Sequence, residues 1–344
     1  MISEKIKPRL FIEVIESMRG IASLGVVCFH FGNGTLPSIV PNSFGSFFDW
    51  AKLGIPLFFI ISGFIIPYSM YSANYTIRDA GRYLLKRMTR MAPPAWISII
   101  IIFCIYFGAV AMNGEPIKGM TWPGTSLEAI LANMWFSFIL FDVDKYIEVY
   151  WTLEVEFQFY ILIALILPLI LKYSSNTLIL SMILIGINAT FFLHGDRILF
   201  FQLNSYFIMG ILLFLYRMNL VKRNYFIYAS CLAATACYMQ IGTNAACASV
   251  IGILLIAFVR FENPITNFLG MISFSLYITH HNSGIVSEFI LRRLYGENPS
   301  DPVMFLMFLI YLGIAIAFGY VFYKLVEAPF LRLSKKISIK PRKL

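Results

Sequence analysis

Residues 18–31 read MRGIASLGVVCFHF, an apolar stretch with a positive charge at Arg19 and an imidazole at His30. Its other side chains are typical of a helix that lies in lipid. The two residues are eleven positions apart, so at ~100° per residue they share nearly the same helix face, about 16 Å apart along the axis. Ionisable groups within a membrane span are costly and mark a functional interior, unless they snorkel to the interface. The stretch predicts a membrane helix whose two polar groups serve either anchoring or chemistry.

The composition of the whole chain supports a membrane location. Of its 344 residues, 59% are hydrophobic and 13% are charged, and the mean hydropathy is +0.76. A soluble globular protein carries about 25% charged residues, so this composition indicates an integral membrane protein. The net charge of +9 is explained by positively charged cytoplasmic loops, and nucleic acid is not an expected partner.

Apolar runs near the ~20 residues that a membrane-crossing helix needs recur along the chain. We expect an all-α polytopic membrane protein with ten spans, at about 11–32, 51–71, 93–112, 150–171, 177–193, 198–216, 225–241, 244–260, 268–291 and 303–325. A further apolar piece at 127–141 is short and flanked by charges. Whether this piece crosses the membrane decides the orientation of every later helix.

The basic residues favour a topology in which 127–141 does not cross. Nineteen of the 27 Lys and Arg residues then lie inside and five outside, while Arg19, Lys52 and Lys324 belong to helices. This distribution follows the positive-inside rule, so both termini are expected in the cytoplasm. The chain shows no internal repeat and no long polar stretch. We expect one membrane domain over 1–344, with a basic cytoplasmic tail at about 332–344.

Two later spans also carry ionisable groups. YWTLEVEFQFYIL (150–162) places Glu154 and Glu156 one to two turns below the outer start of its helix, although acidic groups also favour helix N-termini. SFSLYITHHNSG (273–284) places His280 and His281 mid-helix, about 100° apart, so that one faces inward. His30, His280 and Glu156 would supply enough ligands for a zinc site, but the i, i+4 spacing of helical metal ligands is absent. No metal is expected.

A basic cluster precedes the 93–112 span, where YLLKRMTRMAPP (83–94) follows Arg82. Part of this charge is ordinary positive-inside charge. Guanidinium groups also pair with phosphate oxygens through two parallel hydrogen bonds, so the cluster is a candidate phosphate site at the inner membrane mouth; its members are Arg82, Lys86, Arg87 and Arg90. Glu327, near the inner end of the last span, is a candidate partner for one of these arginines.

Small residues occupy the middle of the second span, GIPLFFIISGFIIPY (54–68), where Ser62 precedes Gly63. Small side chains permit close helix packing, which is the favoured interpretation. They would also leave room for a thin, extended ligand.

Six motifs, taken together, resemble those of the acyltransferase 3 family of integral membrane O-acyltransferases. They occur in the family's order over almost the whole chain: Arg19 with His30, GIPLFFIISGF, Arg87 and Arg90 before a proline, WTLEVEFQFY with Glu156, SFSLYITH with His280, and Glu327 to Phe330. Each motif alone is weak, but six collinear matches are specific. Two positions depart from the pattern, since Glu16 replaces a usual aspartate and THHNSG replaces a usual His-x-Pro. The second departure leaves open whether His280 or His281 has the family role.

The resemblance implies ten core helices and transfer of an acyl group, most often acetyl, from cytoplasmic acyl-coenzyme A to a hydroxyl on the outer side. The expected acceptor is a saccharide or glycolipid, and the expected location is the bacterial inner membrane. A hydrolase-like domain, which some members carry after the last helix, is not expected here. Direct transfer and an acyl-histidine relay both remain open.

The implied roles follow the motifs. Arg87 and Arg90, with Arg82 or Lys86, would hold the donor's phosphates, and Arg19 would guide its pantetheine arm. His30 would act as the base, since an unperturbed imidazole has a pKa of ~6.5. The remaining expected contributors are Glu156, which would orient the imidazole or polarise the acceptor, His280 or Tyr277, which would donate to the thioester oxygen, and the supporting residues Ser62, Tyr277 and Glu327.

A transporter or flippase for a lipid-linked glycan is the alternative, with the intramembrane charges forming its path. The lack of an internal repeat argues against it. The acceptor-binding surface is expected in the loops 33–50, 113–149 and 292–302. Their aromatic residues suit either sugar stacking or the interfacial aromatic belt; these are Trp122, Trp135, Tyr146, Tyr150 and Trp151.

Overall fold

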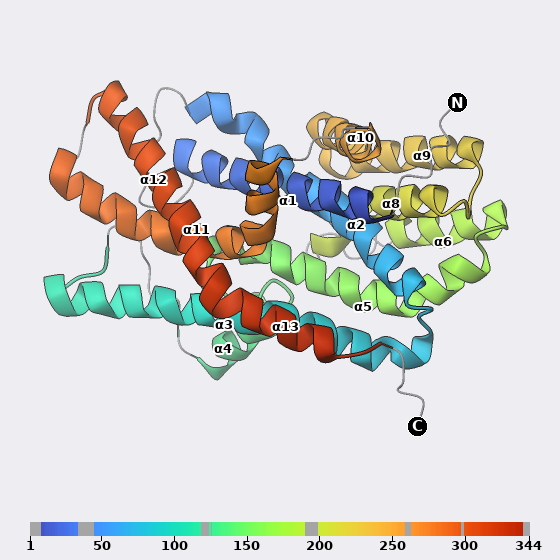
Figure 1. Ribbon diagram of the computed structural model, residues 1–344, viewed down its shortest axis with the longest axis horizontal. Helices are drawn as coiled ribbons and strands as arrows, with labels where there is room; N and C mark the ends of the chain where they lie inside the picture. The colour runs from blue at the N-terminus through green and yellow to red at the C-terminus, as the bar shows by residue number, and fades with distance from the viewer. Residues whose placement is uncertain are drawn as a thin grey trace.

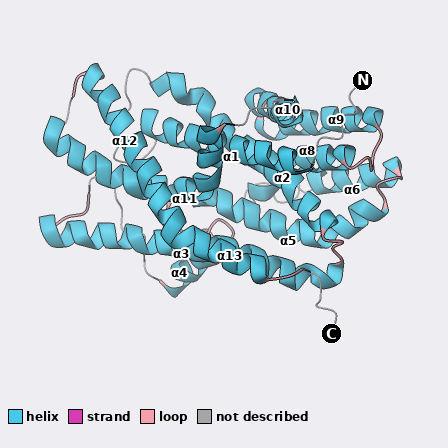
Figure 2. Ribbon diagram, viewed as in Figure 1, coloured by secondary structure: helices cyan, strands magenta, loops and turns pink. Residues whose placement is uncertain are grey.

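A computed structural model describes residues 8–33, 45–117, 124, 126–189, 199–258, 263–296 and 299–339 of the chain. Within these ranges the regular structure is entirely helical (Figures 1 and 2). The α-helices are α1 (Pro8–Gly32), α2 (Gly54–Ser72), α3 (Ala80–Asn113), α4 (Leu127–Met134), α5 (Trp151–Lys172), α6 (Thr177–Ala189), α8 (Leu199–Arg217), α9 (Arg223–Ile241), α10 (Thr243–Phe258), α11 (Pro264–Tyr295), α12 (Asp301–Phe322) and α13 (Ala328–Lys336). Short 3₁₀ turns occur at η1 (Gly45–Leu53), η2 (Ile77–Asp79) and η3 (Glu148–Tyr150), and a π-helical turn, η4 (Tyr323–Glu327), joins α12 to α13.

Each of the ten predicted spans corresponds to a helix in the part of the chain that is described. Among the described residues, five helical segments are long and apolar enough to cross a membrane: Val14–Gly32, Gly45–Ser72, Ile77–Asn113, Glu148–Lys172 and Asp301–Lys336. The segments Thr177–Asn188 and Thr243–Phe258 are apolar but shorter. The prediction of an all-helical integral membrane protein is therefore confirmed.

The apolar piece at 127–141 contains only the eight-residue helix α4, which at ~1.5 Å per residue is about 12 Å long. It cannot cross a hydrocarbon core of ~30 Å. The buried Glu154 carboxylate on α5 holds the turn that follows α4, because it accepts hydrogen bonds from the backbone N–H groups of Ile139 (2.9 Å) and Leu140 (3.2 Å). Glu154 is thus an anchor for this segment, and the expectation that 127–141 does not span the membrane is confirmed.

Helix α3 differs from the expected span at 93–112 because it is one continuous helix that starts 13 residues earlier, at Ala80. Pro93 and Pro94 lie within it. Proline removes backbone donors, but its fixed φ is compatible with helix, and packing against α5, α11 and α13 supports both halves of α3. The basic residues expected in a loop before the helix consequently project from the helix itself.

Two close helix crossings depend on glycine. A Cβ on Gly63 of α2 would lie 2.2 Å from the carbonyl oxygen of Phe207 on α8, and a Cβ on Gly210 would lie 2.1 Å from that of Ile60. At the crossing of α1 with α11, a Cβ on Gly20 would lie 2.4 Å from the backbone nitrogen of Gly270. The favoured packing role of Gly63 is confirmed. These contacts fix the depth at which Ser62 and Arg19, each next to one of these glycines, enter the bundle.

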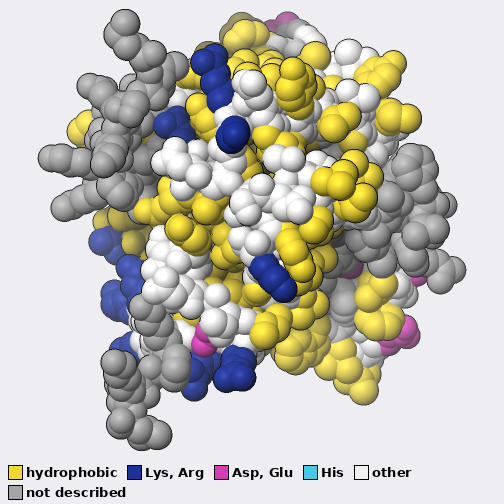
Figure 3. Space-filling view, turned by 90° about the vertical axis from the view of Figure 1, so that its right-hand side faces the viewer, with side chains coloured by type: hydrophobic (Ala, Val, Ile, Leu, Met, Phe, Trp, Pro, Cys, Tyr) yellow, Lys and Arg dark blue, Asp and Glu magenta, His cyan; other side chains and the backbone are white. Residues whose placement is uncertain are grey.

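One end of the bundle carries much of the exposed positive charge. The start of α1 and the end of α13 both lie toward the right-hand end in Figure 1. Viewed from that end, the surface shows scattered Lys and Arg side chains and few acidic ones (Figure 3). Exposed basic residues of the helix ends and turns there include Arg78, Lys172, Lys222, Arg223, Arg332, Lys335 and Lys336. Residues 340–344 of the predicted basic tail lie outside the described part of the chain.

Candidate functional site

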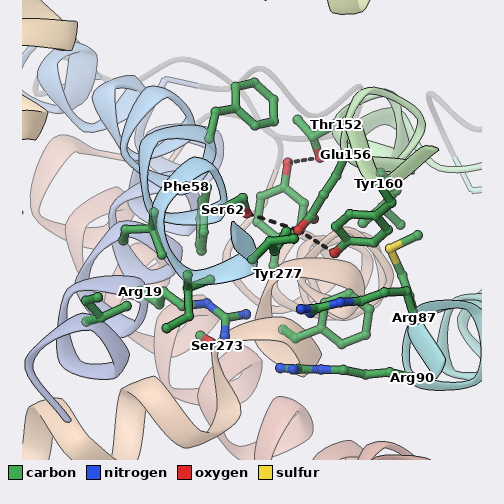
Figure 4. A pocket seen from close by; sticks show the side chains of 18 of the residues that line it. Arg19, Phe58, Ser62, Arg87, Arg90, Thr152, Glu156, Tyr160, Ser273 and Tyr277 are labelled. Atoms are coloured by element: carbon green, nitrogen blue, oxygen red, sulfur yellow. Dashed lines mark hydrogen bonds between the residues drawn. The ribbon is translucent and has the colours of Figure 1, made fainter. Parts of the chain in front are cut away.

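A cavity of about 240 Å³ lies between α1, α2, α3, α5 and α11. Its polar lining combines residues that are far apart in the sequence (Figure 4). Seven of the residues named in the sequence analysis line it together, namely Glu16, Arg19, Ser62, Arg87, Arg90, Glu156 and Tyr277. Five helices therefore converge on one site.

The three arginines supply positive charge that no carboxylate of the described chain neutralises directly. Arg87 and Arg90 are three positions apart on α3 and so share a face, and Arg19 reaches the cavity from α1 (Figure 4). Among the described residues, no carboxylate oxygen lies within 4.0 Å of their guanidinium nitrogens. Arg87 instead donates weakly to the Ser69 hydroxyl at 3.4 Å. Such a cluster is chemically suited to an anionic ligand.

Two carboxylate residues line the cavity, Glu16 of α1 and Glu156 of α5, and the contacts of Glu156 are defined. Its Oε1 accepts hydrogen bonds from the Ser62 hydroxyl at 3.1 Å and from the Tyr160 hydroxyl at 2.6 Å. The structure thus gives Ser62 a hydrogen-bonding role in addition to its small size. Within the described ranges, no group of three or more His, Cys, Asp or Glu side chains is arranged to hold a metal ion.

His30 and His280 lie side by side, although they are far apart in the sequence. Their ring centroids are 5.2 Å apart, and His280 is fully buried. The ring contact identifies His280, rather than His281, as the neighbour of His30. Neither His30 nor His280 lines the cavity.

The backbone fixes the tautomer of His280. Its Nδ1 lies 2.7 Å from the carbonyl oxygen of Tyr277, and because a carbonyl can only accept, Nδ1 carries the hydrogen. A neutral His280 therefore presents a lone pair at Nε2, which has no hydrogen-bond partner among the described residues. In this tautomer Nε2 of a neutral His280 can accept a hydrogen bond but cannot donate one to a thioester oxygen.

Tyr277 connects the cavity with the histidine pair. It lines the cavity, and its ring lies 5.6 Å from that of Phe58 and 5.9 Å from that of His280. Its hydroxyl lies 2.8 Å from the Thr152 hydroxyl. Tyr277 and Phe58 thus form the wall between the arginine-lined space and the two imidazoles.

Three predicted residues lie outside the cavity lining. Arg82 is exposed and Lys86 is half-buried on α3, and neither lines the cavity. Lys86 is one helical turn before Arg90, so the two share a side of the helix. Glu327 is buried on η4, where its Oε2 accepts from the Ser275 backbone N–H at 3.1 Å and from the Ser275 hydroxyl at 2.6 Å. The hydrogen-bond partner of Glu327 is therefore α11, and no arginine nitrogen lies within 4.0 Å of it in the described chain.

The aromatic residues expected at the acceptor-binding surface differ in how far they are buried. Tyr146 and Tyr150 are buried and donate to the carbonyl oxygens of Gly124 and Ala95, which assigns them to packing. Trp135 is 55% exposed, and Trp151 is half-buried. Trp122 lies outside the described residues.

Sequence reasoning missed Tyr83 and Tyr160, whose rings lie 5.6 and 5.4 Å from the Arg87 guanidinium carbon. Tyr160 is inside the quoted WTLEVEFQFY motif, four positions after Glu156. Since i and i+4 side chains are neighbours on a helix, that spacing could have identified it as a partner of Glu156.

Comparisons with known proteins were made for the whole chain. The acyltransferase 3 profile, described as an acyltransferase domain, matches residues 12–324. The peptidoglycan O-acetyltransferase OatA of Listeria monocytogenes is 24% identical over 191 residues, which are 52% of this chain and 28% of that protein. The putative peptidoglycan O-acetyltransferase YrhL of Bacillus subtilis is 24% identical over 166 residues, or 44% and 23% of the two chains. The O-acetyltransferase OatA of Staphylococcus aureus is 23% identical over 196 residues, or 54% and 29%.

The matched part is therefore less than a third of the length of each of these relatives. No solved structure gives a significant match to this chain. The family profile covers most of the chain and all ten predicted spans, apart from residue 11 of the first span and residue 325 of the last. The chain belongs to the acyltransferase 3 family.

Proposed function

We propose that this protein is a membrane O-acyltransferase that moves an acyl group, most simply acetyl, from cytoplasmic acyl-coenzyme A to a hydroxyl of a glycan outside the membrane. The observation that carries the proposal is the cavity in which three arginines without carboxylate partners lead to Tyr277 and the His30–His280 pair. The names of the matched relatives support O-acetylation and a glycan acceptor of the peptidoglycan type.

The orientation that we propose has ten membrane crossings, both termini in the cytoplasm, and the bacterial inner membrane as the location. It is supported by the basic end of the bundle, where α1 starts and α13 ends (Figures 1 and 3), because positive residues are retained on the cytoplasmic side. In this orientation α1 runs outward from Arg19 to His30. The arginines then face the side from which coenzyme A is supplied.

The residues present fit an acyl-coenzyme A donor, which supplies a thioester when it is bound. Arg87 and Arg90 would hold its phosphates, and Arg19 would neutralise charge on the opposite wall of the cavity. Arg82 and Lys86, outside the lining, would attract the anion to the cavity mouth.

The chemistry assigned to the chain is proton transfer at the acceptor hydroxyl. His30 takes the hydroxyl proton as the acyl carbon–oxygen bond forms, and returns it to the thiolate that leaves. His280, with its lone pair at Nε2, would accept a hydrogen bond from protonated His30 or from the acceptor hydroxyl. Tyr277, whose hydroxyl is hydrogen-bonded to Thr152 and Val149 in the structure, would exchange that bond for one to the oxygen on which charge develops. Glu156, held by Ser62 and Tyr160, would polarise the acceptor hydroxyl.

The proposed function is tested with purified protein in lipid vesicles, acetyl-labelled coenzyme A, and peptidoglycan fragments or other envelope glycans as acceptors. We expect a mass increase of one acetyl group on the glycan, with release of free coenzyme A. A protein that consumes no acyl-coenzyme A but moves lipid-linked glycan across the vesicle membrane would establish the transporter alternative instead. Denaturing the protein during turnover and measuring retained label separates an acyl-histidine relay from direct transfer.

Replacing Arg90 by methionine is expected to raise the KM for the acyl donor by about 10- to 100-fold, because a hydrogen bond to a charged group contributes ~1.5–3 kcal/mol. Initial rates at varied donor concentration give the value. Arg223→Met is the matched control, since it removes an exposed arginine at the start of α9 that lies outside the cavity lining. Equal KM changes in the two variants would show that general surface charge, not the cavity, attracts the donor.

A further inference from the structure

We propose that Tyr160 is a positioning residue that holds the Glu156 carboxylate away from Arg87 and thereby keeps Arg87 available for the anionic donor. This inference rests on the proposed function, because it concerns the same cavity. Tyr160 itself is not assigned any contact with the reacting atoms.

Tyr160 contacts both charged groups at once. Its hydroxyl donates to Glu156 Oε1 at 2.6 Å, and its ring lies 5.4 Å from the guanidinium carbon of Arg87. Figure 4 shows the Glu156 carboxylate between the hydroxyls of Ser62 and Tyr160, with the Arg87 side chain below them. Glu156 and Tyr160 are one helical turn apart on α5, so the hydrogen bond is set within that helix.

Each charged group also has a second support. Ser62 of α2 donates to the same carboxylate oxygen at 3.1 Å. The ring of Tyr83 lies 5.6 Å from the Arg87 guanidinium carbon, so two aromatic rings stabilise the cation through their π faces. Glu156 is thus satisfied by two hydroxyls, and Arg87 is held by two rings.

This separation is unusual for opposite charges that line one cavity. Away from water, a carboxylate and a guanidinium attract each other strongly. In the described chain, however, no carboxylate oxygen lies within 4.0 Å of Arg87. An ion pair here would have to be broken before a phosphate could bind, and the affinity for the donor would fall accordingly. Keeping the pair apart leaves the guanidinium N–H groups preorganised for phosphate.

The Tyr160→Phe variant tests this role because it retains the ring and removes only the hydroxyl. Glu156 then loses one of its two donors and can turn toward Arg87. We expect the affinity for coenzyme A, measured by calorimetry on the detergent-solubilised protein, to fall about tenfold. The double variant Tyr160→Phe/Glu156→Gln lacks the Glu156 carboxylate that could turn toward Arg87, so its affinity should return to within about twofold of that of the native chain.

The matched control is Tyr173→Phe, which removes the hydroxyl of another tyrosine that faces a cation, Lys172 at 5.1 Å, but lies outside the cavity. Its affinity for coenzyme A should be unchanged. Rescue by Glu156→Gln separates the proposed role from a merely structural one, since a packing defect at residue 160 would persist in the double variant. Unchanged binding by Tyr160→Phe, or a double variant no better than the single one, would overturn the proposal.

Inorganic pyrophosphate serves as a second probe of the same variants. If the native chain binds pyrophosphate but not coenzyme A, the donor assignment in the proposed function fails, while the role of Tyr160 is still read from pyrophosphate affinities. If it binds neither probe, the arginine cavity is not an anion site and both proposals fail.

Discussion

A His30→Ala variant is expected to lose acyl transfer by about 10²- to 10⁴-fold, the range that a positioned general base contributes. The imidazole lies beside His280 and outside the cavity lining, so the affinity for coenzyme A should be retained. The loss should therefore appear in kcat rather than in the KM for the donor. Initial rates at saturating donor and acceptor, together with calorimetric binding of coenzyme A, measure both quantities.

His281→Gln is the comparison for this variant. His281 is buried next to His280 in sequence, but the ring contact with His30 is made by His280. We expect His281→Gln to keep transfer within about tenfold of the native rate, a loss that packing defects can explain. A folded His30→Ala protein with full transfer activity would eliminate His30 as the base.

The Gly63→Ala variant is expected to disrupt the bundle, because the new methyl group would lie 2.2 Å from a backbone carbonyl oxygen of α8. Backbone cannot rotate away as a side chain can, so α2 and α8 must separate. Overpacking of this kind costs about 1–3 kcal/mol or more. Ser62 would move with α2, and its hydrogen bond to Glu156 would be lost. We expect a lower yield, a lower thermal midpoint and weak transfer activity.

Gly108→Ala provides the control, since a Cβ at Gly108 of α3 meets no atom of the described chain within 4 Å. This substitution introduces the same methyl group into another apolar helix. Its thermal midpoint, measured by size-exclusion chromatography after stepwise heating, should match that of the native chain. Alanine has the higher helix propensity of the two residues, so an equal loss of stability in both variants would show that the α2–α8 crossing is not the cause.

The helices were predictable because apolar length alone identifies a segment that must satisfy its backbone internally in lipid. The non-crossing piece at 127–141 was also predictable, from the balance of Lys and Arg on the two sides. The continuity of α3 through Pro93 and Pro94 was not. Local sequence rules place a helix start at such prolines, whereas the structure stabilises both halves by packing that is remote in sequence.

Part of the candidate site was also predictable from the sequence, and part was not. Motif spacing identified the arginines, Glu156 and the two histidines, because these residue types are costly in lipid and stand out. It could not identify the partners that position them, since the second support of Glu156 and the tautomer of His280 depend on three-dimensional contacts with Ser62 and a backbone carbonyl. Glu327 shows the limit most clearly. Its charge suggested an arginine partner, and Arg90 and Arg19 do act on it electrostatically, but its hydrogen bonds go to Ser275.

The continuous α3 helix fixes the distance between the arginines and the His280 region of α11. Arg90 lies eight positions before Ser98, about 12 Å along the axis at ~1.5 Å per residue. Ser98 donates to the carbonyl oxygen of Ile278 and accepts from Asn282, which clamps α3 to the turn of α11 that bears His280. The spacing between the arginines and the imidazoles is thereby set by a single continuous helix. A molecule that reaches from one to the other is selected by its length as well as by its charge.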